Sequence, residues 1–322
     1  MRTLRGLGFL ALFLGFAQVV FGAIVRITAS GMGCGDHWPD CYGSFTPAHG
    51  GSNLLVEISH RYGAAALSLA IAALAVAAWI KRREHGVGGP GGVLRASLLA
   101  ILLIVVAALF GAVTVKMELD PMVVVTHLAI AMALLAALVV VVIRAGGLGS
   151  FAVAERSART LRAGRAAAGL TFLALVLGAL TANTPGAPLA CQGFPWCTMI
   201  GERGTPLVIH VAHRIIAFLL LGHLIGLVIA IRKRAEPRPI RAAAWIALSI
   251  AALQIVYAAA MVEMHLPASL RSVHEAIGTI LWISVVTLTA LASGQHFMTD
   301  IERIVYESPS RGEFATPEGV ST

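Results

Sequence analysis

Charge is scarce in this chain. Only 12% of its 322 residues are Asp, Glu, Lys or Arg, whereas 58% are hydrophobic, and the mean hydropathy is +0.84. A soluble domain needs more charge to cover its surface, so the composition argues against a soluble fold. Cysteine is scarce too, with four residues in the whole chain. The class that remains is a protein whose apolar surface faces lipid.

The chain contains long apolar runs, which also indicate a membrane protein. Each is about 20 residues long, which as a helix spans a bilayer core of about 30 Å. The eight runs cover residues 7–27, 56–80, 96–115, 122–144, 163–183, 207–231, 242–262 and 271–292. We therefore expect an all-α membrane protein with eight transmembrane helices, the first of them an uncleaved helix rather than a signal peptide. The polar stretch 294–322 is expected to be a cytoplasmic tail.

Basic residues gather in alternate loops. Arg2 and Arg5 precede the first run, and clusters of Lys and Arg follow the second, fourth and sixth runs. Because cytoplasmic loops are enriched in Lys and Arg, both termini are predicted to be cytoplasmic, in a multi-pass protein of the bacterial cell membrane. The pI of about 9.9 then reflects topology and contact with anionic lipid of the bilayer, and no nucleic-acid partner is expected.

A histidine pattern occurs twice. The segment Glu57-Ile58-Ser59-His60-Arg61 returns as His210-Val211-Ala212-His213-Arg214, and each copy is followed by one further histidine in a later apolar run, His127 and then His274. With four runs in each half and the same orientation, the chain is predicted to be a parallel repeat of two four-helix bundles. The halves are residues 1–145 and 146–293.

The four repeated histidines are expected at one depth, near the outer leaflet, because each lies within about two turns of the outer end of its run. Neutral imidazole is the usual protein ligand of haem iron, and two imidazoles on facing helices can hold a porphyrin between them. A lone membrane histidine would be interpreted as a hydrogen-bonded core residue. Four at matched positions favour haem ligation by His60 with His127 and by His213 with His274.

Three charged neighbours of these histidines have two interpretations each. Arg61 and Arg214 are candidates for binding haem propionates, or they simply extend to the membrane interface. Glu57 shares a helix face with His60 and could take up protons near a haem edge, or it is a helix N-terminal carboxylate. Its repeat position holds His210. This difference between matched positions suggests a reactive site in the first half and a resident haem in the second.

All four cysteines lie in outer loops, where the compartment permits disulfides. The local pairing, Cys34–Cys41 and Cys191–Cys197, respects the repeat, although four cysteines allow three connectivities. A structural staple is the favoured role, and a redox-active dithiol is the alternative. A metal site at the first pair is disfavoured, because the spacing is not Cys-x-x-Cys and the second copy lacks the neighbouring His and Asp residues.

Together these residues resemble the haem A synthase family, in its bacterial type with two cysteine pairs. The resemblance covers the eight apolar runs, and the loop from Gly31 to Cys41 is its most specific element. It implies that the enzyme oxidises a methyl group of haem O to a formyl group through a hydroxymethyl intermediate, supplying haem A to terminal oxidases. It implies haem b as cofactor on His213 and His274, haem O as substrate on His60 and His127, and Glu57 as the catalytic group.

The resemblance also implies partners. Haem O has to be supplied, which points to haem O synthase, and its oxidation requires an electron acceptor that the sequence does not identify. The sequence is also compatible with a homo-oligomer. Two other functions fit the histidines: a b-type electron carrier with two resident haems, and a haem transporter or chaperone. The electron carrier does not explain why Glu57 in one half is exchanged for His210 in the other, and the transporter or chaperone does not explain the matched second pair of histidines.

Overall fold

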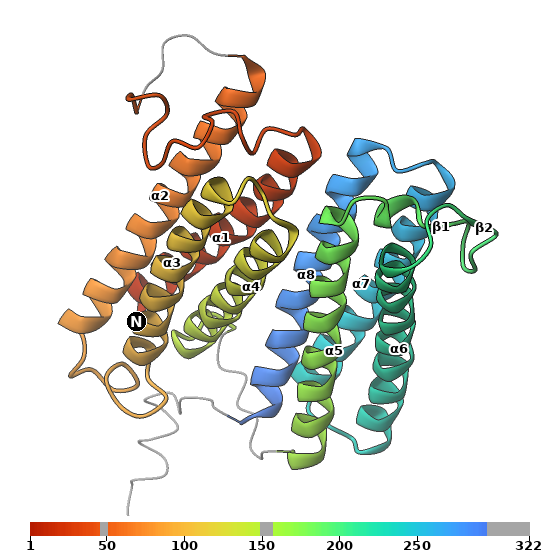
Figure 1. Ribbon diagram of the computed structural model, residues 1–322. Helices are drawn as coiled ribbons and strands as arrows, with labels where there is room; N and C mark the ends of the chain where they lie inside the picture. Colours follow the sequence, from red (N-terminus) through yellow and green to blue (C-terminus); the bar gives the residue numbers. More distant parts are fainter. Residues whose placement is uncertain (46–50, 149–156, 295–322) are drawn as a thin grey trace, which may run out of the picture.

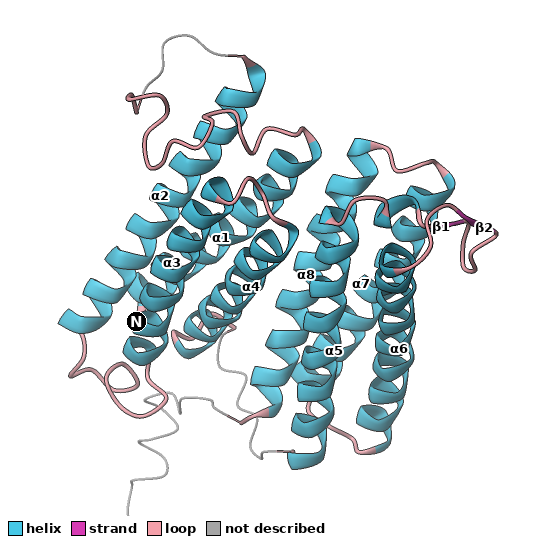
Figure 2. Ribbon diagram, viewed as in Figure 1, coloured by secondary structure: helices cyan, strands magenta, loops and turns pink. Residues whose placement is uncertain are grey.

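The computed structural model describes residues 1–45, 51–148 and 157–294, and this part of the chain is mainly helical, with almost no strand (Figures 1 and 2). Eight helices in it are long and apolar enough to cross a membrane, so the prediction of eight spanning helices is confirmed. They are α1 (Arg2–Ile27), α2 (Ser52–Ile80), α3 (Val93–Lys116), α4 (Pro121–Arg144), α5 (Ala158–Asn183), α6 (Thr205–Lys233), α7 (Arg238–Glu263) and α8 (Ala268–Ala292).

The helices start one to five residues before the apolar runs, and two of them, α4 and α5, have a side-chain cap at this start. Asp120 caps α4: its carboxylate accepts hydrogen bonds from the backbone N–H of Met122 (2.9 Å) and Val123 (3.2 Å). Pro121, at the first helical position, has no N–H that needs a partner. Ser157 caps α5 through Thr160 N. These caps satisfy the exposed N–H groups of a helix start, so the helix can begin outside its apolar stretch.

The helices pack as two groups of four (Figure 1). In the first half, each of α1 to α4 contacts the next, and α4 returns to contact α1; α5 to α8 close in the same way. The halves meet where α1 and α4 pack on α8 and α4 packs on α5. At this seam Met132, Leu135 and Val139 of α4 are buried against Trp282 of α8, whose indole N–H donates to the Met132 carbonyl (2.8 Å). Buried apolar contacts therefore join the halves.

Two disulfide loops lie at one end of the bundles, which we call the cysteine end. The loop between α1 and α2 contains the Cys34–Cys41 disulfide, and the loop between α5 and α6 contains Cys191–Cys197. The second loop also includes a 3-10 turn, η1 (Ala187–Leu189), and a short antiparallel pair, β1 (Cys191–Gln192) with β2 (Met199–Ile200). Each loop covers the start of the helix that carries a repeated histidine, α2 or α6.

Candidate haem sites

The four repeated histidines lie in the same register in both halves. Counted from the first residue of the helix, His60 in α2 and His213 in α6 are each the ninth residue (from Ser52 and Thr205). His127 in α4 and His274 in α8 are each the seventh (from Pro121 and Ala268). All four helices start at the cysteine end, so the histidines lie at one depth of the bundles.

Within the first half, His60 and His127 lie near each other. A glycine lies beside each ring: a Cβ on Gly22 would be 3.3 Å from His60 Cε1, and one on Gly111 would be 3.5 Å from His127 Cε1. These glycines leave room at both rings that a larger side chain would fill. The structure thus brings together the two histidines predicted for the first site.

In the second half, His213 and His274 both line a cavity of about 1400 Å³, a volume that includes the open solvent at its mouth. Gly178 lies against His213 as Gly22 does against His60, with its hypothetical Cβ 3.0 Å from the ring. The lining is mostly apolar, with polar side chains concentrated near the cysteine end. Apolar walls with a few polar groups are typical of cofactor sites.

The ring nitrogens of the second pair suit a metal. His213 Nδ1 is 3.0 Å from the Ala174 carbonyl oxygen. Since a carbonyl oxygen only accepts, Nδ1 carries the proton, and the lone pair of Nε2 is free for a ligand. His274 Nδ1 is buried and has no hydrogen-bond partner in the described part of the chain. Each imidazole of the pair thus has one ring nitrogen without a described protein partner, and an apolar cavity flanked by both rings fits a haem. No group of three or more His, Cys, Asp or Glu side chains suited to a bare metal ion occurs among the described residues.

Two glutamines contact the histidines. In the first half, the Gln18 amide nitrogen lies 3.0 Å from His60 Nδ1 and donates to the His60 carbonyl (2.8 Å). In the second half, the Gln254 amide nitrogen lies 3.2 Å from His274 Nε2 and donates to the His274 carbonyl (3.0 Å). Each half therefore has one histidine held by a side-chain amide from a neighbouring helix, α1 or α7.

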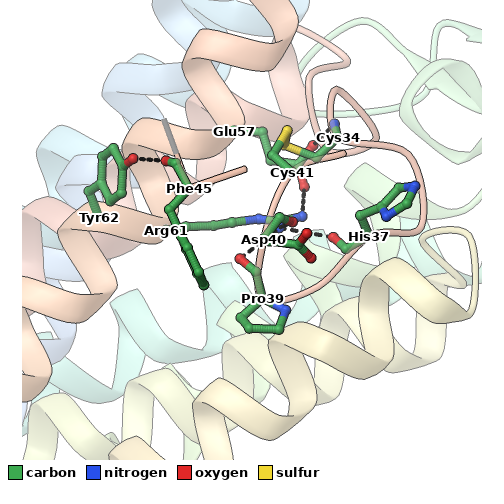
Figure 3. The surroundings of a disulfide bond; sticks show 9 residues. All are labelled: Cys34, His37, Pro39, Asp40, Cys41, Phe45, Glu57, Arg61 and Tyr62. Carbon is green, nitrogen blue, oxygen red and sulfur yellow. Dashed lines mark hydrogen bonds and ion pairs between the residues drawn. A yellow bond between two sulfur atoms is a disulfide. The ribbon is translucent and has the colours of Figure 1, made fainter. Parts of the chain in front are cut away.

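Glu57 connects α2 to the first disulfide loop (Figure 3). Its side chain is buried, 4% exposed. One carboxylate oxygen accepts from the Cys34 backbone N–H (2.8 Å) and the other from the Arg61 guanidinium (2.5 Å). Arg61 in turn donates to the carbonyls of His37 (2.9 Å) and Asp40 (2.7 Å). The loop, the disulfide and the helix that carries His60 thus form one hydrogen-bonded unit.

The second half has the same arrangement without the carboxylate. Arg214 donates to the carbonyls of Cys191 and Gly193, each at 2.7 Å. His210, at the position of Glu57, is bonded through Nδ1 to the Ala187 carbonyl (2.8 Å). Both arginines that follow a repeated histidine therefore hold a disulfide loop in this structure. Their contact with haem propionates stays a prediction.

Several polar contacts of the site could not be read from the histidine pattern. Gln18 and Gln254 are isolated polar residues inside apolar runs, and that isolation is the signal that could have identified them. An ion pair between Arg26 of α1 and Glu275 of α8 (3.8 Å) crosses the seam between the halves. His223, which lies deeper in α6, contacts the Ala163 carbonyl (2.9 Å) and so joins α6 to α5.

The fold and the site define a class: a multi-pass helical membrane protein with two matched histidine pairs. The sequence matches the family model of cytochrome oxidase assembly proteins (COX15-CtaA) over residues 5–286. The chain belongs to this family.

Curated relatives carry a more specific name, heme A synthase. The relative from Bacillus mycoides (strain KBAB4) is 29% identical over 67% of this chain and 70% of its own length. That from Alkalihalophilus pseudofirmus is 30% identical over 65% and 69%. That from Bacillus cereus (strain AH187) is 28% identical over 70% and 72%. The resemblance stated from the residues is thereby confirmed at the level of the family.

Proposed function

We propose that the chain is a haem A synthase, which oxidises a methyl group of haem O to a formyl group through a hydroxymethyl intermediate. One observation carries the proposal: two histidine pairs in identical register, of which only the first has a buried carboxylate, Glu57, one turn from its leading histidine. Family membership and the name that the curated relatives share support it.

The second half is the resident site in this proposal. His213 and His274 would hold haem b, since both line the apolar cavity and the Ala174 carbonyl leaves His213 Nε2 available. When bound, this haem supplies a one-electron redox centre. The protein's own contribution is to fix the rings, exclude water with the apolar lining, and close the cysteine end with the loop that Arg214 holds.

The first half is the substrate site. His60 and His127 would bind haem O, and the glycines beside both rings leave space for the macrocycle. Glu57 is the proposed proton acceptor during oxidation of the methyl group. With water as the oxygen source, converting the methyl group to hydroxymethyl releases two protons and two electrons, and converting hydroxymethyl to formyl releases two more of each; both electron pairs pass to an external acceptor. Arg61 has a positioning role, because it orients the Glu57 carboxylate.

The setting follows from the chemistry. The substrate would come from haem O synthase within the same bilayer. With the basic loops on the cytoplasmic side, both termini are cytoplasmic and the haem sites lie toward the outer leaflet. The test is chromatography of acid-extracted haems from cells that lack this chain and then regain it. We expect haem O to accumulate without the chain, and hydroxylated intermediate and haem A to return with it. Haem B alone in the purified protein, with no change in cellular haem A, would instead indicate an electron carrier.

A further inference from the structure

Arg26 belongs to the first half but lines the cavity of the second. It lies at the end of α1, next to the seam at which α1 packs on α8. Its guanidinium is 3.8 Å from the carboxylate of Glu275, the residue that follows His274, and both side chains line the cavity. The second-half cavity is therefore completed by a side chain from the first half.

Arg271 is a second cation at the same place. It lies on α8 one turn before Glu275, lines the cavity, and is close enough to act on the charge of Arg26. Among the described residues, the cavity lining thus contains the guanidinium groups of Arg26 and Arg271 but only one carboxylate, that of Glu275. This leaves a surplus positive charge at the rim of an apolar cavity, and such a charge is costly without an anionic partner.

Neither of these arginines makes a side-chain hydrogen bond within the part of the chain that the structure describes. The Arg26 guanidinium has only the ion pair with Glu275, although its side chain is just 21% exposed. Arg214, which also lines the cavity, has its donors directed to the loop carbonyls of Cys191, Gly193 and Pro195. The N–H groups available to a bound anion are therefore those of Arg26 and Arg271.

We propose that Arg26 and Arg271 bind the propionate carboxylates of the haem in the second half. The inference rests on the proposed function, because it takes that haem as resident. Guanidinium groups bind carboxylates through paired N–H donors, and the resulting charge-assisted bonds are among the strong ones in proteins. Glu275 holds Arg26 in place through the ion pair between them. The resident site thus depends on both halves.

The repeat supports an assignment to the second haem alone. Arg26 is four residues after Gly22, and the residue four after Gly178 is Ala182. The positions of Arg271 and Glu275 relative to His274 correspond, relative to His127, to Val124 and Leu128. None of the residues that match these three by repeat position, Ala182, Val124 and Leu128, is charged. A site that releases its ligand needs weaker anchoring than one that keeps it.

The test compares haem b with its dimethyl ester, in which the propionates carry no charge. Full-length protein depleted of haem in detergent is titrated with each compound, and binding is followed by the optical spectrum. Wild-type protein should prefer haem b to the ester. Arg26→Gln should weaken haem b binding about tenfold or more, as expected for loss of a charged hydrogen bond, and leave ester binding unchanged. Arg26→Lys should recover most of the haem b affinity, and Arg271→Gln should behave as Arg26→Gln does.

The control is Arg203→Gln, which removes an exposed cation from the second loop of the same half and should change neither titration. Equal weakening of haem b and ester by Arg26→Gln would overturn the proposal, because it would mean that the ion pair to Glu275 only holds the halves together. Equal wild-type affinity for haem b and ester would overturn it as well. If His213→Ala binds both compounds as wild type does, then the resident site itself, and not only its anchoring, is wrong.

Discussion

The two halves place glutamine at opposite positions of the same scaffold. Gln18 lies four residues before Gly22, and the matching residue before Gly178 is Ala174. Gln254 lies ten residues before Met264, and the matching residue before Met117 is Ala107. In the first half, the leading histidine, His60, is thus held by a side-chain amide, whereas in the second half, His213 is held by a backbone carbonyl.

This exchange separates a fixed site from an adaptable one. A backbone carbonyl cannot move away, so it fixes the tautomer and orientation of His213. A glutamine side chain can rotate, so His60 can change partner when a ligand enters or leaves. The structure therefore assigns the more rigid leading ligand to the half that we propose keeps its haem, and the more adaptable one to the half that exchanges substrate for product.

The largest expected effect comes from replacing the repeated histidines, with different results in the two halves. His213→Ala or His274→Ala should remove essentially all of the resident haem b, because each deletes one of the two histidines proposed to hold it. His60→Ala should leave the haem b spectrum in place and stop haem A formation. The measurement is the haem b content per protein, from the optical spectrum of purified variants. Equal loss of haem b from variants in both halves would mean that the two sites do not differ in the way we propose.

The next effect concerns the repeat position that holds Glu57 in the first half and His210 in the second. Glu57→Gln should reduce haem A formation by about a hundredfold or more, the usual contribution of a proton-transfer group, while haem b is retained. His210→Gln should have little effect on the chemistry. Both effects are measured as the amount of haem A per cell, determined by chromatography and divided by the amount of the variant protein.

Glu57 also holds the first loop, so this prediction needs a matched control. Arg61→Gln breaks the same ion pair and keeps the carboxylate. If proton transfer is the role of Glu57, then Arg61→Gln should lose much less haem A formation than Glu57→Gln does. An equal loss of haem A formation in both variants would mean that Glu57 only supports the loop and does not transfer a proton.

Much of the fold could be predicted from the sequence, because it depends on local information. Apolar runs of bilayer length gave all eight helices, and the spacing from each run's start gave the shared depth of the histidines. The contacts across helices could not be predicted this way. That Arg26 meets Glu275, or that Gln18 meets His60, depends on how α1 packs against α8 and α2, which no local pattern in one helix encodes.

A smaller effect distinguishes the two disulfides. Replacing either cysteine pair by serine should lower stability by about 2 kcal/mol in the chain-entropy model, since both close loops of similar length, with separations of 7 and 6 residues. Thermal unfolding in detergent measures this. Only the Cys34→Ser/Cys41→Ser variant should also reduce haem A formation. This disulfide closes the loop whose Cys34 backbone N–H donates to Glu57, so its removal should loosen the loop around that carboxylate. The same reduction from the Cys191→Ser/Cys197→Ser variant would contradict the division between the halves.

The smallest effect is a pH dependence that belongs to the first loop alone. Lys116, 3.3 Å from Asp36, holds the pKa of that carboxyl below its usual value of 3.8 through a hydrogen bond and its charge. The second half has no equivalent cation, since the position of Lys116 is taken by Glu263. Because the pKa is depressed in the folded state, the pair stabilises the loop above the usual carboxyl pKa, and this contribution is lost as pH falls through the folded value.

Asp36→Asn should therefore lower the stability of the loop slightly at neutral pH, remove the further loss that the wild type shows as pH falls below about 4, and leave the value at low pH almost unchanged. An exposed pair contributes little and is weakened by salt, so low ionic strength is the sensitive condition. Protease cleavage of the first loop, followed across this pH range, is the measurement. Lys116→Gln should give the same profile as Asp36→Asn. If both variants keep the wild-type acid dependence, then other carboxylates control the loop, and this difference between the halves has no energetic consequence.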